Sequence, residues 1–157
     1  MYVRPHLEYA VASWSPWTVE DKEVLERVQR RALRMVSNIR GRTYEARLGE
    51  VGMTSLEERR VRGDMITTYR IMTGKDKVDP GQFFDMVADG PGPRTRGVTG
   101  VYNIRGVNAR LDIRRYSFGQ RVVSTWNSLP DRLKGVGTVL GFKTGYDEWV
   151  TGGRLGA

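Results

Sequence analysis

The arginines of this 157-residue chain are the side chains whose type and spacing best fit a chemical task. All but five of the 26 basic residues are arginines, and a guanidinium group can donate paired hydrogen bonds to a phosphate and stack on bases. Between residues 94 and 134 there are nine basic and two acidic side chains, so this stretch supplies +7 of the formal net charge of +8. This concentration of charge predicts a surface that binds a polyanion and favours nucleic acid.

The candidate nucleic-acid-binding residues form two clusters, an arginine stripe on a predicted helix and a basic stretch with two tyrosines that could stack on bases. They are Arg27, Arg30, Arg31 and Arg34 in the stripe, and Arg94, Arg96, Tyr102, Arg105, Arg110, Arg114, Arg115, Tyr116 and Arg121 in the stretch. Each cluster has an alternative interpretation. The stripe could pair with Glu20, Glu23 and Glu26 in the same helix, and the stretch could be a structural hairpin with a basic surface.

Composition and motifs argue against catalysis. The chain has no cysteine and one histidine, His6, and it lacks both a phosphate-binding glycine loop and a His-Glu-x-x-His motif. The acidic pairs Glu20-Asp21 and Glu57-Glu58 fall in the first turns of predicted helices, where they interact favourably with the helix dipole. We therefore expect no enzyme activity, no metal site and no cofactor.

Hydropathy and cysteine content bear on the compartment. No apolar run approaches the length of a membrane span, and no signal peptide is recognisable, so we expect no membrane partner. The absence of cysteine excludes a disulfide framework and suits a reducing compartment.

The elements that must position the arginines are predicted to be mainly helices. Thr18 and Ser55 each precede an acidic residue by three positions, which is the pattern of a capping box, and they open predicted helices over 19–39 and 56–73. Further helices are expected after Pro5, Thr43, Asp79 and Ser117 and through Val139 to Trp149. In the 19–39 helix an apolar stripe at 3.6-residue spacing predicts the side that packs, and it consists of Leu25, Val28, Ala32, Met35, Val36 and Ile39.

Glycine and proline divide the chain. Residues 1–88 are predicted to form a helical domain, and the breaker run at 89–97 is a predicted linker. Residues 98–157 then form a basic C-terminal subdomain with a hairpin or extended arm over 98–113 and two helices, in which Trp126 anchors the core. The expected fold class is mainly α, a small helical bundle with a short β-hairpin or extended basic arm in its C-terminal half.

A series of short motifs runs along nearly the whole chain, from Tyr2 to Trp149. In order they are Tyr2-Val-Arg-Pro-His-Leu-Glu-Tyr9, Trp14-Ser-Pro16, Leu25-Glu-Arg-Val-Gln-Arg-Arg-Ala32, Tyr44-Glu45, Arg47-Leu48, Leu56-Glu57, Arg59-Arg60, Asp64, Tyr69, Gly74, Arg94-Thr-Arg-Gly97, Gln120-Arg-Val-Val123, Trp126-Asn-Ser-Leu-Pro130 and Phe142-Lys143. Taken together, this ordered set resembles the region just past the polymerase core of non-LTR (LINE-type, jockey-like) retrotransposon reverse transcriptases.

The resemblance covers the thumb and the C-terminal segment of that family alone. The polymerase signature, an aromatic residue followed by any residue and Asp-Asp, is absent, and the chain contains no Asp-Asp pair. In the family the thumb packs helices along the template–primer duplex, and the C-terminal segment binds template RNA or target DNA. By position, the resemblance carries these roles to Arg27 to Arg34 and to Arg94 to Arg121, which are also the clusters found by counting charges.

We therefore expect a non-catalytic fragment of a retrotransposon RNA-directed DNA polymerase that grips template–primer or structured RNA through phosphates. The expected partners are RNA or an RNA/DNA duplex, target DNA as a further candidate, and the polymerase core of the parent protein. The resemblance implies an intracellular protein that is nuclear with a cytoplasmic ribonucleoprotein stage. Two alternatives are a helical protein-interaction module that binds an acidic partner and a decayed remnant without function.

Overall fold

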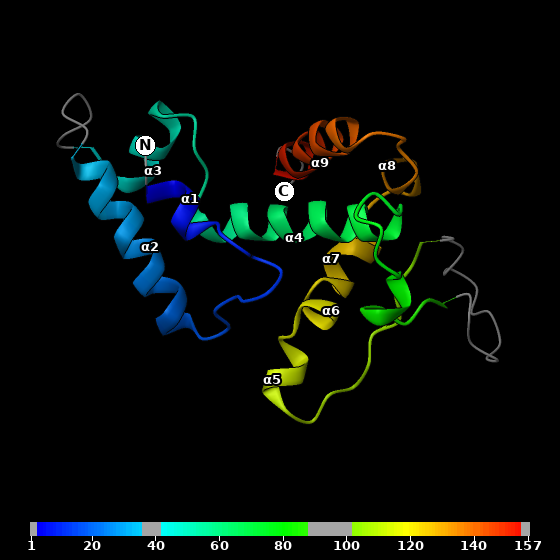
Figure 1. The fold of residues 1–157 in the computed structure, drawn as a ribbon. Coiled ribbons are helices and arrows are strands. Elements are labelled where there is room, and N and C mark those ends of the chain that lie inside the picture. Colours follow the sequence, from blue (N-terminus) through cyan, green and yellow to red (C-terminus); the bar gives the residue numbers. More distant parts are fainter. Residues whose placement is uncertain (1–2, 36–41, 88–101, 155–157) are drawn as a thin grey trace. The chain divides into compact units, whose positions relative to one another are not determined.

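The structure is a computed structural model that describes residues 3–35, 42–87 and 102–154. These residues are mainly helical and contain no β-strand (Figure 1). The helices are α1 (Val3–Leu7), α2 (Val19–Arg34), α3 (Tyr44–Glu50), α4 (Leu56–Met72), the 3-10 helix η2 (Pro80–Gln82), α5 (Asp112–Arg115), α6 (Phe118–Arg121), α7 (Val123–Ser128), α8 (Asp131–Lys134) and α9 (Val139–Arg154). The mainly helical class predicted from the sequence is confirmed. Within the described ranges, no helix is long and apolar enough to cross a membrane.

The chain divides into two compact units, residues 1–63 and residues 64–157. The boundary between them falls inside helix α4. The linker predicted at 89–97 lies outside the described residues. Each unit is built around its own core, and the two cores differ in chemistry.

Local side-chain caps determine where α2 and α3 begin, as the sequence predicts, whereas α2 ends at Arg34, before the predicted end at residue 39. At the start of α2 the Thr18 hydroxyl accepts a hydrogen bond from the Asp21 backbone N–H at 3.1 Å, and at the start of α3 Thr43 accepts one from Ala46 at 3.3 Å. These caps satisfy N–H groups that have no partner within the helix. Gly74 follows the end of α4 with φ of +68°, a left-handed conformation that costs glycine least.

The first unit has a mixed core. Its buried apolar side chains come from α1 to α4 and from the loop after α1, and they are Leu7, Val11, Leu33, Leu48 and Leu56. Gln29 of α2 and Arg59 of α4 are buried among them. The Arg59 guanidinium donates from Nε to Glu8 Oε1 at 2.5 Å and from Nη2 to Gln29 Oε1. Burying these polar groups costs little because each is paired.

The side chain of Glu26 accepts a second set of hydrogen bonds in the same unit. Its carboxylate accepts a hydrogen bond from the Leu56 backbone N–H at 3.1 Å, and so caps the first turn of α4 from another helix. It also accepts a hydrogen bond from the hydroxyl of Tyr44. Burial, together with this carboxylate, raises the pKa of Tyr44 to about 12.

Helix α2 packs through a different side from the one its apolar stripe predicts. Val28 is 44% exposed and Met35 is 73% exposed, so the prediction that they pack is wrong. Leu25 and Ala32 are half-buried, and Val36 and Ile39 lie outside the described residues. The buried positions of the helix are instead Gln29 and Leu33. The physical reason is the buried Arg59, which requires the amide of Gln29 as a partner and so turns that side of α2 inward.

The second unit has an aromatic core. The rings of Tyr69 in α4 and Phe142 in α9 stack with their centroids 4.3 Å apart, and the Trp126 ring of α7 lies 6.1 Å from Phe142. Trp126 is fully buried, as the sequence predicts. The hydroxyl of Tyr69 donates to the carbonyl of Val136, and burial raises the pKa of Tyr69.

A hairpin or extended arm was expected over 98–113, and its described part, residues 102–113, contains no hairpin. The only ladder contact there is a single bridge between Ile104 and Met86, and α5 begins at Asp112. Asn103 and Arg105 form backbone hydrogen bonds with Val87 and Asp85, and the side-chain amide of Asn127 in α7 pairs with the backbone of Ile104 between them. It accepts from the Ile104 N–H at 3.0 Å and donates to the Ile104 carbonyl at 2.8 Å. Backbone polar groups need a partner, and a side chain supplies it here.

Candidate nucleic-acid interface

The basic segment, defined here as residues 105–116 of the second unit, exposes four arginines. Arg105, Arg110, Arg114 and Arg115 all lie at the surface. In the described part of the chain, a single carboxylate lies within ion-pair distance of one of these arginines. It is that of Asp112, whose Oδ1 is 3.7 Å from Arg115 Nη1. Both members of this pair are well exposed, so solvent screens it and it holds Arg115 weakly. The segment therefore presents cationic groups that remain available to an anion.

The helices that follow hold both ends of the basic segment. At its start the N–H of Val107 donates to the side chain of Gln120 in α6 at 2.9 Å, next to the Asn127 contacts on Ile104. At its end the Ser117 hydroxyl donates to the Arg114 carbonyl at 2.8 Å. The arginines thus project from backbone that is anchored on either side.

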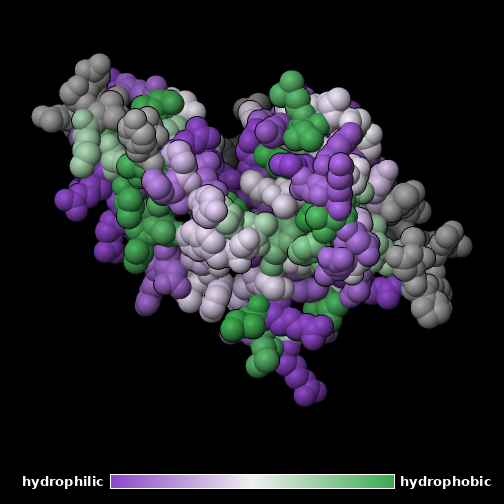
Figure 2. Space-filling model, in the orientation of Figure 1, coloured by the Kyte–Doolittle hydropathy of each residue, from purple (hydrophilic) through white to green (hydrophobic). Residues whose placement is uncertain are grey.

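Two aliphatic side chains lie among the arginines. Leu111 is 71% exposed and Ile113 is 73% exposed. Figure 2 shows the result around α5, where hydrophobic and hydrophilic side chains alternate on the surface. In the sequence these two residues belong to the loose alternation that predicted a hairpin or extended arm, and the structure exposes both.

The two tyrosines proposed to stack on bases are placed differently. Tyr116 ends α5 and is 38% exposed, beside Arg114 and Arg115 in the chain. Tyr102 is half-buried, and its carbonyl accepts a hydrogen bond from the indole N–H of Trp126 at 2.6 Å. Tyr116 is therefore the tyrosine whose ring is more accessible to a base.

Arg121 differs from the arginines of the basic segment because its guanidinium is engaged. Its Nε lies 2.8 Å from Asp64 Oδ2, and its Nη2 lies 2.9 Å from Asp64 Oδ1. This is the paired geometry in which a guanidinium binds a carboxylate most strongly. Its remaining nitrogen donates to the Tyr116 carbonyl at 3.3 Å. Arg121 therefore fastens the end of α6 to Asp64 of α4.

Lys134 belongs to the basic stretch by sequence but does not reach its surface. The side chain is buried, and Nζ donates to Asn103 Oδ1 at 2.8 Å. Burial lowers the pKa of Lys134, against the opposing effect of Asp131. The charge of residues 94–134 is thus not all available to a partner.

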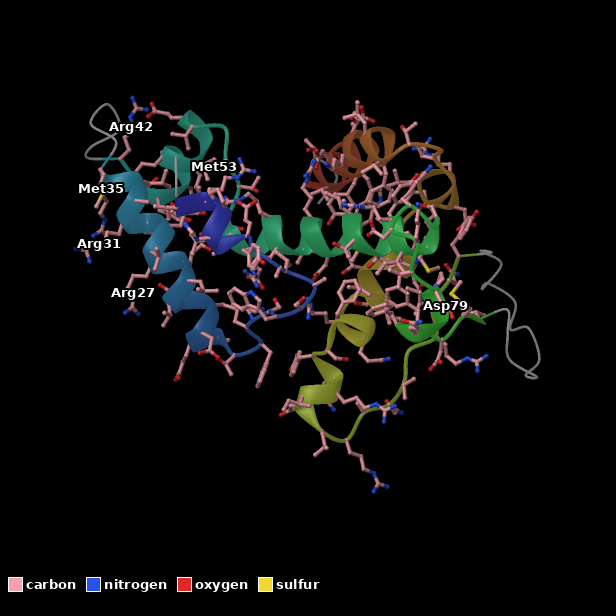
Figure 3. All side chains as sticks on the ribbon, viewed as in Figure 1. Arg27, Arg31, Met35, Arg42, Met53 and Asp79 are labelled. Carbon is pink, nitrogen blue, oxygen red and sulfur yellow. The ribbon has the colours of Figure 1, made fainter. Side chains whose placement is uncertain are left out.

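The arginine stripe of α2, in the first unit, is divided by the structure. Arg30 Nη1 pairs with Glu23 Oε1 at 2.7 Å, and the Arg30 guanidinium lies 5.0 Å from the centre of the Tyr44 ring. Arg27, Arg31 and Arg34 are exposed, and no described carboxylate lies within ion-pair distance of them. Figure 3 shows Arg27 and Arg31 on the side of α2 that is turned away from α1. Pairing within the helix, the alternative interpretation, applies to Arg30.

Other site predictions can be placed briefly. Arg94 and Arg96 lie outside the described residues. The acidic pairs at positions 20–21 and 57–58 occupy the first turns of α2 and α4. Among the residues that the structure describes, no group of three His, Asp or Glu side chains is placed to hold a metal ion.

Sequence reasoning missed Gln120 and Asn127, the two amides that hold the start of the basic segment. A signal for them exists in the spacing. In the single helix predicted from Ser117 to Leu129, which the structure divides into α6 and α7, residues seven apart lie on the same side. Two amides at this spacing beside a tryptophan predicted to be buried indicate a polar edge that could bind backbone.

The chain was compared with protein-family models, with curated proteins and with solved structures, and none of the three comparisons found a match.

Proposed function

We propose that this chain is a non-catalytic nucleic-acid-binding module whose basic segment grips the phosphates of RNA or an RNA/DNA duplex. The observation that carries the proposal is the exposure of Arg105, Arg110, Arg114 and Arg115 with a single screened carboxylate among them. Arginines that are not already engaged release counterions when they meet phosphate, and this release is the main source of affinity for a nucleic-acid backbone.

The motifs quoted from the sequence support the same proposal from another side. They resemble the thumb and C-terminal segment of non-LTR retrotransposon reverse transcriptases, and the basic segment lies in the part that corresponds to the C-terminal segment. We infer that the chain acts together with a polymerase core on a template–primer duplex, with target DNA as a second substrate. This places its proposed work in the nucleus, after a cytoplasmic ribonucleoprotein stage.

The chemistry of the segment predicts how it would bind. Guanidinium–phosphate contacts read no bases, so sequence preference is weak and dependence on salt is steep. Stacking of a base on the exposed Tyr116 ring would add about 1–3 kcal/mol for single-stranded nucleic acid. Such stacking needs an unpaired base, so tighter binding of single-stranded nucleic acid than of duplex would reveal it.

The test is the dependence of binding on salt, measured by fluorescence anisotropy with duplex RNA, an RNA/DNA hybrid and duplex DNA. Replacement of Arg105, Arg110, Arg114 and Arg115 together by Gln should lower the slope of log K against log salt by about 3–4 units, close to one per lost phosphate contact. A second variant, with Arg27, Arg31 and Arg34 replaced by Gln, removes three charges and should lower the slope by clearly less than three units. An unchanged slope in the segment variant, with the α2 variant nearly salt-independent, would refute the proposal and move the interface to α2.

The non-catalytic part of the proposal has its own test. The purified chain should neither extend a primer nor cut nucleic acid in the presence of magnesium. Magnesium-dependent extension that a single Asp substitution abolishes would refute it.

A further inference from the structure

The exposed side of helix α2 combines arginines with aliphatic side chains in an ordered way. We call it the α2 face and define it as Val24, Arg27, Val28, Arg31, Arg34 and Met35, all of which are exposed. At 100° per residue the three arginines fall within about 60° of the helix circumference, and the three aliphatic residues fall within the adjoining 40° or so. An arginine row of about two turns therefore runs beside an aliphatic row of about three turns.

Among the described residues of the first unit, none covers this face. The opposite side of α2 carries the buried Gln29 and Leu33. Figure 3 shows Arg27, Arg31 and Met35 pointing away from α1, and Figure 2 shows hydrophobic and hydrophilic side chains next to one another along α2. The arginine row also has no described carboxylate at ion-pair distance, whereas Arg30, just outside the face, is paired with Glu23.

The composition of the face indicates what kind of partner fits it. A nucleic-acid backbone would bind the arginines but would leave the aliphatic row exposed. That row contains no aromatic ring on which a base could stack. A helix with aliphatic residues along one side would bury Val24, Val28 and Met35, in the manner of ridges that pack into grooves. Acidic residues at the edge of such a helix would meet the arginine row.

We propose that the α2 face binds an acidic amphipathic helix of a partner protein. A second copy of this chain is the less suitable occupant because its own α2 face would bring a second arginine row against the first. This binding is separate from the proposed grip on nucleic acid, which uses the basic segment of the other unit.

The experiment uses the full chain and a designed peptide. The probe is a labelled 21-residue helical peptide with Leu at positions a and d of each heptad and Glu at e and g, and the control peptide has Gln in place of Glu. Binding is followed by fluorescence anisotropy. We expect the Glu peptide to bind at least tenfold more tightly than the Gln peptide, with an affinity that falls as salt rises.

Variants locate the site. Val28→Asp and Arg31→Glu each change one exposed residue of the α2 face, and each should weaken peptide binding at least tenfold while the melting temperature stays that of the parent. Arg114→Glu makes the same charge change in the basic segment and should leave peptide binding unchanged. The salt slope on duplex RNA should fall in the Arg114 variant and stay nearly that of the parent in the two α2 variants. Failure of one proposal is therefore distinguishable from failure of the other.

Several outcomes would overturn the inference. The first two are that the peptide does not bind, or that the Glu and Gln peptides bind equally. The third is that the Arg114 variant, and not the α2 variants, loses peptide binding. The fourth is that duplex RNA displaces the peptide from the Arg114 variant. Sedimentation that shows a dimer of the parent chain and a monomer of the Val28→Asp variant would assign the face to self-association and would also overturn it.

Discussion

The pairing of Arg121 with Asp64 makes a prediction that separates structure from binding at one residue. The sequence places Arg121 in the nucleic-acid site, whereas two hydrogen bonds of 2.8 and 2.9 Å engage it with a carboxylate that is 7% exposed. Replacement of Arg121 by Met keeps most of the length of the side chain and removes its charge. We expect the variant to be less stable and to bind nucleic acid with the salt slope of the parent.

The magnitude follows from burial. Removing one partner of a buried ion pair typically costs about 3–5 kcal/mol, because the other charge remains in a poorly solvated place. Arg121 is 15% exposed and water can partly reach the site, so we expect about 3 kcal/mol. That is a large fraction of the stability of a small protein. Adding Asp64→Leu removes the buried carboxylate as well, and this double variant should recover about 2 kcal/mol of the loss.

The assay is urea unfolding of the parent, both single variants and the double variant, followed by circular dichroism. The salt slope on duplex RNA is measured for the same four proteins. Our reasoning is refuted if Arg121→Met unfolds like the parent while its salt slope falls by about one unit, because Arg121 would then contact phosphate and not depend on Asp64.

Three further predictions concern stability. Trp126→Ala removes a fully buried indole and should cost about 3–5 kcal/mol, measured by thermal unfolding, and a variant that melts like the parent but binds nucleic acid poorly would make Trp126 a stacking residue instead. The pKa of Tyr44 is about 12 in the folded chain and near 10 in the unfolded chain. The stability linked to this difference is therefore complete below pH 10 and is lost as the pH rises to 12. Tyr44→Phe should flatten that decline by up to about 2 kcal/mol in urea unfolding at several pH values, and an identical decline in both proteins would contradict this. In Gly119→Ala the new Cβ would lie 2.4 Å from the Phe83 carbonyl oxygen, so the backbone must shift, and the melting temperature should fall by an amount that matches about 1–3 kcal/mol.

The starts of the helices were the most predictable part of the fold because they depend on neighbours in the chain, whereas α2 ends at Arg34 and not at residue 39. Thr18 and Thr43 cap the helices that their spacing predicts, and Gly74 follows α4 with the left-handed backbone expected of it. Trp126 was predicted to be core because its apolar neighbours recur at helical spacing. These inferences require no knowledge of distant residues.

The packed side of α2 was not predictable in the same way. It depends on Arg59, which lies 30 residues beyond Gln29 in the chain and enters the core only because that amide and Glu8 can pair with it. A hydrophobic pattern assigns Gln29 to the surface and Val28 to the core, and the structure has the reverse. Long-range polar pairs of this kind leave no local signal.

The candidate interface was predictable in part from local sequence and depended in part on distant residues. Counting charges located the basic segment, and the structure exposes its four arginines. Counting did not separate them from Arg121 or Lys134, whose engagement depends on Asp64 and Asn103 elsewhere in the chain.

The position of the unit boundary inside helix α4 has a consequence for anyone who divides this chain. A cut between Gly63 and Asp64 would leave each fragment with about two turns of a helix, which is too short to be stable in water without its continuation. The second fragment would also lose the Ser55 hydroxyl that accepts from Glu58 and begins the helix. A fragment meant to carry the aromatic core should therefore start at or before Ser55, and one meant to carry the α2 face should extend through Gly74. The two halves then overlap in sequence, and each retains the whole of α4.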